Sequence, residues 1–230
     1  MSNINFYKAI PKKYLNDSYY NPNVKTGALV HPFRCAIVGT SGSMKTNSLL
    51  NIINKCQCFD RYYLIAKNTD EPLYAYFIEY FEKVGKKVGQ PVITYSNSLE
   101  DLPSVDDLDP NLQNLVIIDD MISENLKKHP KLTDLFIRGR KHNCSVIFIS
   151  QNYFSIPKVI RQQCTYFILK RINNKKDIKM IVNESALDKT PEEVFDLYKK
   201  ASKNNEDFFL IDTVTTDDTK RYRKNFDEKV

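Results

Sequence analysis

The stretch CAIVGTSGSMKTNSLLNII, residues 35–53, decides the fold of this chain. Its first four residues are apolar like a buried strand, and an apolar helical pattern begins after Lys45 and Thr46. The loop between these two segments contains Gly39 and Gly42. A strand, a glycine-containing loop, Lys-Thr and a helix follow one another in this order in phosphate-binding loops. The less specific alternative is an ordinary strand–turn–helix in which Gly39 only marks the turn.

A phosphate-binding loop predicts a role for each part of this stretch. Successive backbone N–H groups of the loop and of the helix start would face the β-phosphate of a nucleotide. Lys45 would bring a positive charge to the β- and γ-phosphate oxygens, and the hydroxyl of Thr46 would ligate Mg²⁺. The residues expected to contact the nucleotide are Gly39, Thr40, Ser41, Gly42, Ser43, Met44, Lys45 and Thr46.

Met44 departs from the usual pattern, in which a glycine precedes the lysine. Glycine adopts backbone angles that other residues reach only at a cost in free energy. We therefore expect the side chain of Met44 to crowd the turn or to restrict its backbone angles.

A second apolar run, residues 115–118, ends in two acids, Asp119 and Asp120. Beside a phosphate loop, this arrangement is typical of enzymes that hydrolyse nucleotides. Asp119 would hold the shell of Mg²⁺, mostly through water. Asp120 stands where many ATPases carry a glutamate that polarises the attacking water. The alternative is a pair of solvated acids at the end of a strand.

Gln151 follows another apolar run, residues 145–150. Ligands of open α/β sheets bind in the crevice at the carboxyl ends of the strands, where this glutamine would lie. We expect it to orient the water or to sense the γ-phosphate. A surface glutamine that begins a loop is the alternative.

Residues 132–142 begin as an apolar helix and end with a dense group of positive charges. Positive charge at a helix end is stabilised by the helix dipole and needs no further function. The more specific hypothesis is that Arg138 or Arg140 is an arginine finger, offered to the γ-phosphate of a neighbouring subunit.

Further outward, short apolar runs without polar alternation suit strands buried on both faces. They lie at residues 35–38, 62–66, 92–95, 115–118, 146–149, 166–169 and 208–211. Helical patterns separate them, and the pattern from Leu73 to Val84 has Thr69 or Asp70 as its expected cap. The alternation predicts an α/β fold, a three-layer P-loop NTPase domain with a mainly parallel central sheet.

We expect this domain to span residues 31–215. Residues 1–30 show no period and are expected to form an N-terminal arm. Residues 216–230 are expected to form a basic C-terminal tail, solvated rather than folded.

The composition excludes several classes of protein. With 230 residues, 42% of them hydrophobic, the chain is able to form a sizeable core and is not a disordered protein. The 34 lysines and arginines exceed the 28 acids by 6, which permits a polyanionic partner without requiring one. The five cysteines lack the spacing of a zinc site and are expected to be reduced. No apolar run is long enough for a transmembrane segment.

In this order, these motifs resemble the genome-packaging ATPases of large eukaryotic DNA viruses and virophages, within the FtsK/HerA branch of the P-loop NTPases. The resemblance covers residues 30–175. Besides the phosphate loop and the acids, it is carried by His31-Pro32-Phe33, Arg138-Gly139-Arg140, residues 146–154, Ile156-Pro157 and Arg161.

The resemblance implies a homo-oligomeric ring that hydrolyses ATP with Mg²⁺ and pushes double-stranded DNA into a capsid. It further implies a docking partner, a capsid or internal-membrane vertex protein, and a location in the host-cell cytoplasm (virus factory) and in the virion. Gln151 matches the sensor glutamine of the family, and Arg138 or Arg140 its arginine finger.

Two groups of basic residues offer contacts for DNA phosphates, which a translocating motor would bind without regard to sequence. They are Lys170, Arg171, Lys175 and Lys176, and then Lys199, Lys200 and Lys203. Lysine-rich helix faces that are merely solvated are the alternative. Two other functions also stay open: a nucleotide kinase, and a nucleotide-binding scaffold in which Met44 weakens hydrolysis.

Overall fold

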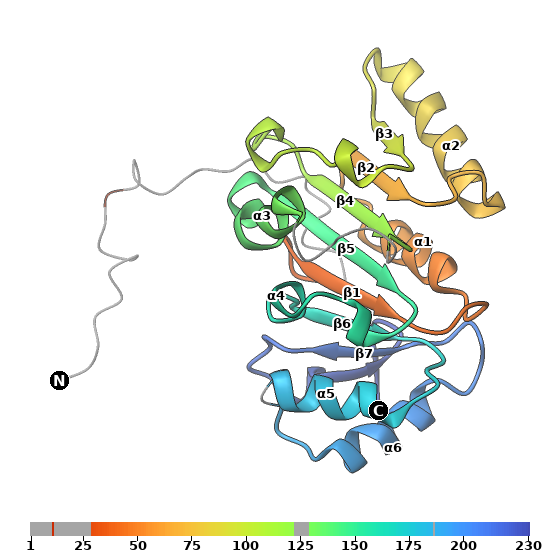
Figure 1. Ribbon diagram of the computed structural model, residues 1–230, viewed down its shortest axis with the longest axis vertical. Helices are drawn as coiled ribbons and strands as arrows, with labels where there is room; N and C mark the ends of the chain where they lie inside the picture. The colour runs from red at the N-terminus through yellow and green to blue at the C-terminus, as the bar shows by residue number, and fades with distance from the viewer. Residues whose placement is uncertain (1–10, 12–28, 122–128, 186) are drawn as a thin grey trace.

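One mixed sheet organises the chain, whose computed structural model describes residues 11, 29–121, 129–185 and 187–230 (Figure 1). Within these residues the strand order is β3-β2-β4-β5-β1-β6-β7-β8-β9. The bounds are β1 (Arg34–Val38), β2 (Arg61–Ala66), β3 (Ile93–Ser96), β4 (Asn114–Asp119), β5 (Cys144–Ser150), β6 (Tyr166–Leu169), β7 (Phe209–Asp212), β8 (Tyr222–Lys224) and β9 (Glu228–Lys229).

The sheet is parallel from β3 to β6 and antiparallel from β6 to β9. The predicted α/β fold with a mainly parallel sheet is therefore confirmed. The predicted arm, residues 1–30, lies outside the described residues except for its positions 11, 29 and 30.

Helices cover both faces of the sheet and complete three layers. They are α1 (Lys45–Cys56), α2 (Pro72–Val88), α3 (Pro130–Arg138), α4 (Lys158–Arg161), α5 (Lys175–Ser185) and α6 (Pro191–Ala201). Helices α1 and α2 pack on one face, whereas α3, α4, α5 and α6 pack on the other. None of the described helices is long and apolar enough to cross a membrane.

The central strands explain why their sequences lack alternation. In β5, Val146 and Phe148 belong to the same core as α3, while Ile147 and Ile149 belong to the core of α1. Both faces of the strand are thus covered by helices. A continuous apolar run is the expected consequence.

The prediction of a solvated C-terminal tail is wrong. Residues 222–224 form β8, which pairs with β7, and β9 pairs with β8. The buried ring of Tyr222 stacks on Phe209 with centroids 6.1 Å apart. The buried guanidinium of Arg223 forms an ion pair with Asp212 at 3.5 Å. The basic residues suggested a solvated tail, but part of their charge is paired inside the sheet, so the strand was not predicted.

Helix α2 starts later than expected. It begins at Pro72, and its N-cap is Glu71 rather than Thr69 or Asp70. The side chain of Glu71 makes no capping hydrogen bond, so it is not committed to the helix. Glu71 and Leu73, at the start of α2, line the pocket described next.

Candidate nucleotide-binding site

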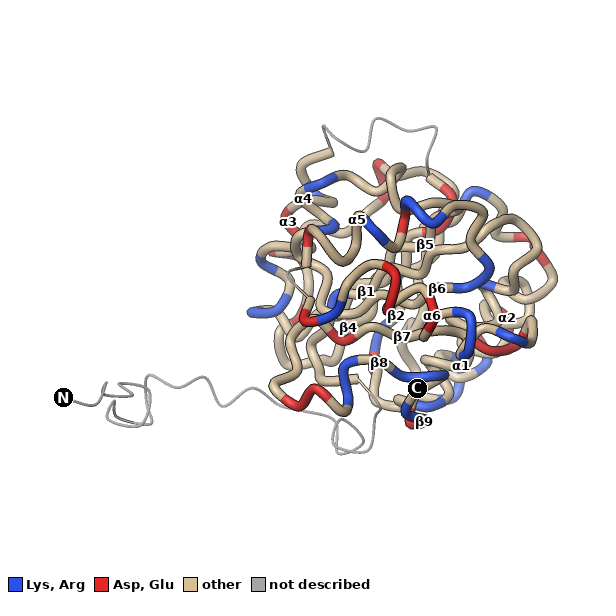
Figure 2. Tube along the Cα trace, turned by 90° about the horizontal axis from the view of Figure 1, so that it is seen from below, with Lys and Arg blue, Asp and Glu red and all other residues tan. Residues whose placement is uncertain are grey.

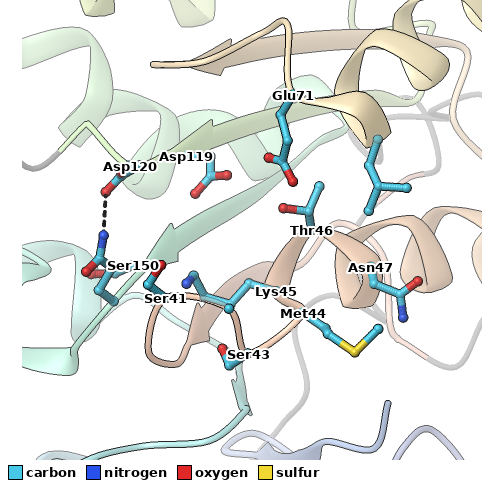
Figure 3. A pocket seen from close by; sticks show the side chains of 13 residues that line it. Ser41, Ser43, Met44, Lys45, Thr46, Asn47, Glu71, Asp119, Asp120 and Ser150 are labelled. Carbon is cyan, nitrogen blue, oxygen red and sulfur yellow. Dashed lines mark hydrogen bonds between the residues drawn. The ribbon is translucent and has the colours of Figure 1, made fainter. Parts of the chain in front are cut away.

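The predicted site residues meet at one edge of the sheet, where β1, β4 and β5 end. The register pairs Val38 of β1 with Ser150 of β5, and Asp119 of β4 with Ile149 of β5. A pocket of about 570 Å³ opens there (Figure 3). Its lining comprises Ser41, Gly42, Ser43, Met44, Lys45, Thr46, Asn47, Glu71, Leu73, Asp119, Asp120, Ser150 and Gln151.

The loop between β1 and α1 is anchored to both neighbouring strands. The N–H of Gly39 donates to the carbonyl of Ser150 at 3.1 Å, and the N–H of Thr40 donates to the carbonyl of Arg171 at 2.8 Å. A Cβ on Gly39 would lie 2.6 Å from the Cβ of Lys170, so only glycine fits without displacement. The loop is therefore wedged between β5 and β6 in the manner a phosphate cradle requires.

Lys45 lies in this pocket and points back over the loop. Its Nζ donates to the carbonyl of Thr40 at 3.0 Å. Burial lowers the pKa of Lys45, while the negative charges of Asp119 and Asp120 raise it. A phosphate oxygen carries negative charge and the Thr40 carbonyl does not, so a bound phosphate would be the stronger acceptor for the Lys45 ammonium.

Met44 has the restricted backbone that was expected of it. Its φ is 63° and its ψ 38°, in the left-handed region. Its carbonyl still starts the helix by accepting from the N–H of Ser48 at 3.1 Å. The side chain is 38% exposed and lines the pocket rather than the core. Methionine in place of glycine therefore strains the backbone, while its side chain finds room in the pocket.

The two acids at the end of β4 have different surroundings. The hydroxyl of Tyr74 donates to Oδ2 of Asp119 at 2.6 Å. Burial raises the pKa of Asp119 to about 6, against the opposing effects of the Tyr74 hydrogen bond and the Lys45 charge. Asp120 has a φ of 54°, and its Oδ1 accepts from Nε2 of Gln151 at 3.3 Å. Asp120 and Gln151 are thus brought together as the sequence suggested.

The oxygen donors suit Mg²⁺. The Thr46 hydroxyl and the Asp119 carboxylate lie in one pocket, and Mg²⁺ prefers oxygen ligands from one or two side chains together with phosphates. Among the described residues, no group of three or more His, Cys, Asp or Glu is placed to hold a metal alone.

Two residues at the start of α2 were missed from the sequence. Glu71 lines the pocket beside Thr46 and Asp119, and Tyr74 is a fully buried partner of Asp119. In Figure 3 the Glu71 carboxylate lies between Asp119 and Thr46. The usable signal was an acid shortly after the predicted strand at residues 62–66, at the same edge as the other acids.

Arg171 was missed as a cation of the phosphate loop. Its Nε donates to Oγ1 of Thr40 at 3.4 Å. It also lines a second pocket, of about 620 Å³, together with Thr40, Ser41 and Gln151. Arg171 therefore lies beside the phosphate loop.

The two arginine-finger candidates lie far from their own chain's pocket. Both come shortly before β5 in the chain, whereas Gln151 follows its end. β5 has seven residues, and at roughly 3.3 Å per residue its ends are about 20 Å apart. Arg138 is held by Asp106 at 2.6 Å and Asp134 at 3.5 Å, while Arg140 is exposed. This geometry excludes either arginine from acting on its own subunit's phosphates without a large rearrangement.

One member of the first basic group, Lys170, does not lie on the surface. Lys170 is 1% exposed. Its Nζ donates to the backbone carbonyls of Asn205, Glu206 and Asp207 at 2.6, 3.1 and 2.8 Å. Lys170 was therefore wrongly grouped with DNA-contacting residues, because its charge closes a turn.

Lysines of the two basic groups nevertheless meet on the surface of α5 and α6. Nζ of Lys175 lies 4.6 Å from the centroid of the Phe195 ring, and Nζ of Lys199 lies 4.9 Å from it. In Figure 2, Lys and Arg occur on several sides of the molecule, interspersed with Asp and Glu. The overall charge pattern therefore singles out no face.

A comparison with family descriptions matches residues 24–230 to the family described as Poxvirus A32 protein. The chain belongs to this poxvirus A32 family. The match includes the phosphate loop, both acids and Gln151, and it confirms the kinship with poxvirus-type proteins that the motifs indicated. No curated protein sequence matches the chain.

Solved structures share the fold of this A32 family member. The genome packaging NTPase B204 of Sulfolobus turreted icosahedral virus 2, in complex with AMPPCP, is 12% identical, with a TM-score of 0.56 over 84% of this chain and 96% of that one. The DNA-packaging ATPase B204 of Sulfolobus turreted icosahedral virus is 13% identical, with a TM-score of 0.54 over 85% and 97%. At this identity the likeness concerns the fold.

Proposed function

We propose that this chain is an ATP-hydrolysing motor that translocates double-stranded DNA into a viral capsid. The observation that carries the proposal is the convergence of the phosphate loop, Asp119, Asp120 and Gln151 on one pocket. Membership of the poxvirus A32 family supports it. So does the fold shared with B204, a genome packaging NTPase that binds AMPPCP and ATP-gammaS.

In this proposal the loop and Lys45 bind the triphosphate of ATP, and the N–H groups that start α1 face the β-phosphate. Thr46 and Asp119 hold Mg²⁺, which when bound neutralises charge on the β- and γ-phosphate oxygens. Asp120 accepts a proton from the attacking water. Gln151 orients that water through its hydrogen bond to Asp120.

The distance between the basic end of α3 and the pocket supports an assembly of several copies. An arginine about 20 Å from its own site at the other end of β5 is able to act only on a neighbour. We therefore propose a homo-oligomeric ring in which the exposed Arg140 completes the site of the adjacent subunit. Arg138 is the weaker candidate, because two carboxylates already neutralise its charge.

The proposed place of action follows from the proposed function. A packaging motor works in the host-cell cytoplasm and in the virion, and it docks on a capsid or internal-membrane vertex protein. The DNA partner would be contacted through phosphates, without sequence preference. Lys175 and Lys199, whose ammonium groups lie 4.6 and 4.9 Å from the centroid of the Phe195 ring, are the proposed contacts on this chain.

The first experiment measures ATP hydrolysis by the purified chain with and without double-stranded DNA, alongside its mass in solution. We expect hydrolysis that DNA stimulates, from an oligomer, and no hydrolysis by Lys45→Ala. Transfer of phosphate to a nucleotide acceptor without release of inorganic phosphate would contradict the proposal in favour of a kinase. Tight ATP binding without single-turnover hydrolysis would contradict it in favour of a scaffold.

The second experiment tests the DNA contact with matched charge changes. The double variant Lys175→Ala, Lys199→Ala removes two positive charges from α5 and α6. The control Lys86→Ala, Lys87→Ala removes two exposed charges from the end of α2. We expect only the first pair to weaken DNA binding and to reduce its salt dependence. Equal effects of both pairs would contradict a specific role for this surface.

A further inference from the structure

Tyr74 connects helix α2 to the two residues proposed to hold Mg²⁺. Its ring is 1% exposed, and its hydroxyl donates to Oδ2 of Asp119 at 2.6 Å. The side chain of Thr46 lies next to the same hydroxyl. One buried phenol therefore contacts a residue from the end of β4 and a residue from the first turn of α1.

The chemistry of a phenol fixes what the Tyr74 hydroxyl is able to do toward each of these two neighbours. A tyrosine hydroxyl has a single proton and otherwise accepts. Because that proton goes to Asp119, the phenol oxygen is able only to accept from the neighbouring hydroxyl of Thr46. The lone pairs of the Thr46 oxygen then stay free for a cation, and Oδ1 of Asp119 is left without the Tyr74 contact.

The position of the phenol is fixed by the packing of α2. On the same helix, Phe77 and Ile78 are buried in the core shared with α1 and β4. Edge contacts between Phe77 and Tyr62, with ring centroids 5.7 Å apart, hold the helix against β2. The Tyr74 hydroxyl is thus presented by a rigid element rather than by a loop, as precise positioning requires.

We propose that Tyr74 is a positioning residue that holds Asp119 and Thr46 in the arrangement that takes up Mg²⁺ with the nucleotide. The inference rests on the proposed function, and it adds a residue outside the phosphate loop and the acidic strand. Removing a residue that orients metal ligands typically lowers the metal affinity by about 10- to 100-fold.

The test is Tyr74→Phe, which keeps the ring and removes only the hydroxyl. The matched control is Tyr222→Phe, because Tyr222 is also buried and its hydroxyl also donates to a carboxylate, Asp188, at 2.9 Å. Tyr222 lies on β8, several strands away from the phosphate loop. Mn²⁺ affinity is measured by electron paramagnetic resonance in the presence of AMPPCP, and AMPPCP affinity is measured separately in EDTA.

We expect Tyr74→Phe to weaken Mn²⁺ binding by about 10-fold or more and to leave AMPPCP affinity in EDTA unchanged. The control should change neither. Wild-type Mn²⁺ affinity in Tyr74→Phe would overturn the inference, as would equal losses in both variants. If the wild-type chain binds no AMPPCP at all, the proposed function itself fails, which is a distinguishable result.

A second measurement does not depend on whether the variant folds. Tyrosine carrying ¹³C at Cζ is introduced at position 74 of the unaltered chain, and in a separate sample at position 222. We expect Mg²⁺ added to the AMPPCP complex to shift the resonance from position 74 and not the one from 222. An unmoved resonance at position 74 would contradict the inference.

Discussion

Gln151 donates a hydrogen bond from Nε2 to Oδ1 of Asp120 at 3.3 Å. The two residues are 31 positions apart in the chain and follow neighbouring strands, β5 and β4. Asp120 adopts the left-handed backbone conformation, with a φ of 54°, as the chain leaves β4. The contact couples an acid that is able to accept a proton to an amide that is able to orient water.

Asp120→Asn should retain ATP binding and lose hydrolysis by on the order of 10²-fold or more, because its amide cannot accept the proton of the water. Single-turnover hydrolysis and equilibrium nucleotide binding check this. Gln151→Ala is the companion variant, in which the acid remains but loses its partner, and a smaller loss is expected. Undiminished turnover in Asp120→Asn would mean that another group is the base.

Glu71→Gln tests whether Glu71, rather than Asp120, is the general base. No described residue holds the Glu71 carboxylate by a hydrogen bond or ion pair, and it lines the same pocket as Lys45. We expect a rate loss smaller than that of Asp120→Asn. Nucleotide affinity should be kept or tightened, because one negative charge beside the triphosphate is removed. A loss of about 10²-fold in Glu71→Gln with little loss in Asp120→Asn would reverse the two assignments.

Met44→Gly should keep or tighten ATP binding. Glycine relieves a left-handed conformation that costs a non-glycine residue about 1–2 kcal/mol. It also adds freedom to the unfolded chain, at roughly 0.5–1 kcal/mol. Stability should therefore change little in denaturant unfolding. Met44→Ala shortens the side chain without relieving the backbone, and serves as the control. A marked loss of ATP affinity in Met44→Gly alone would mean that the pocket uses the methionine side chain.

Arg140→Ala and Asp120→Asn should each be nearly inactive alone. An arginine finger contributes roughly 10³–10⁵ in rate in other NTPases. Mixed rings should regain activity, because some interfaces then pair an intact Arg140 with an intact Asp120. Hydrolysis by mixtures of proven co-assembly is the measurement. Mixtures as inactive as the separate variants would assign Arg140 a structural role. Full activity of Arg140→Ala alone would direct attention to Arg138.

The raised pKa of Asp119, about 6, has a consequence for stability without metal and nucleotide. A carboxyl whose pKa is raised by folding stabilises the fold in its protonated form, and this contribution is lost as pH rises through about 6. Asp119→Asn never ionises. Its stability relative to wild type should therefore be higher at about pH 7.5 than at about pH 5. Denaturant unfolding at both pH values checks this, and an equal difference at both would refute it.

The sequence by itself determined the central part of the fold. Continuous apolar runs predicted the seven strands β1 to β7, because a strand buried on both faces has no polar side. Residues 39–46 were recognisable as a candidate phosphate loop, because local backbone geometry sets the spacing between the glycines and Lys45-Thr46. The acids of β4 and the glutamine after β5 were predictable because parallel strands end at one edge of the sheet.

Only the tertiary structure decided which distant side chains meet. Tyr74 reaches Asp119 because α2 packs on the same face of the sheet as α1, and no local pattern encodes that contact. Lys170 looked like a surface charge, but the turn at residues 205–207 buries it. Residues 222–224 looked like a solvated tail, but β7 offers them an edge to pair with. In each case the contacting residue is distant in the sequence, so composition and local spacing do not predict the contact.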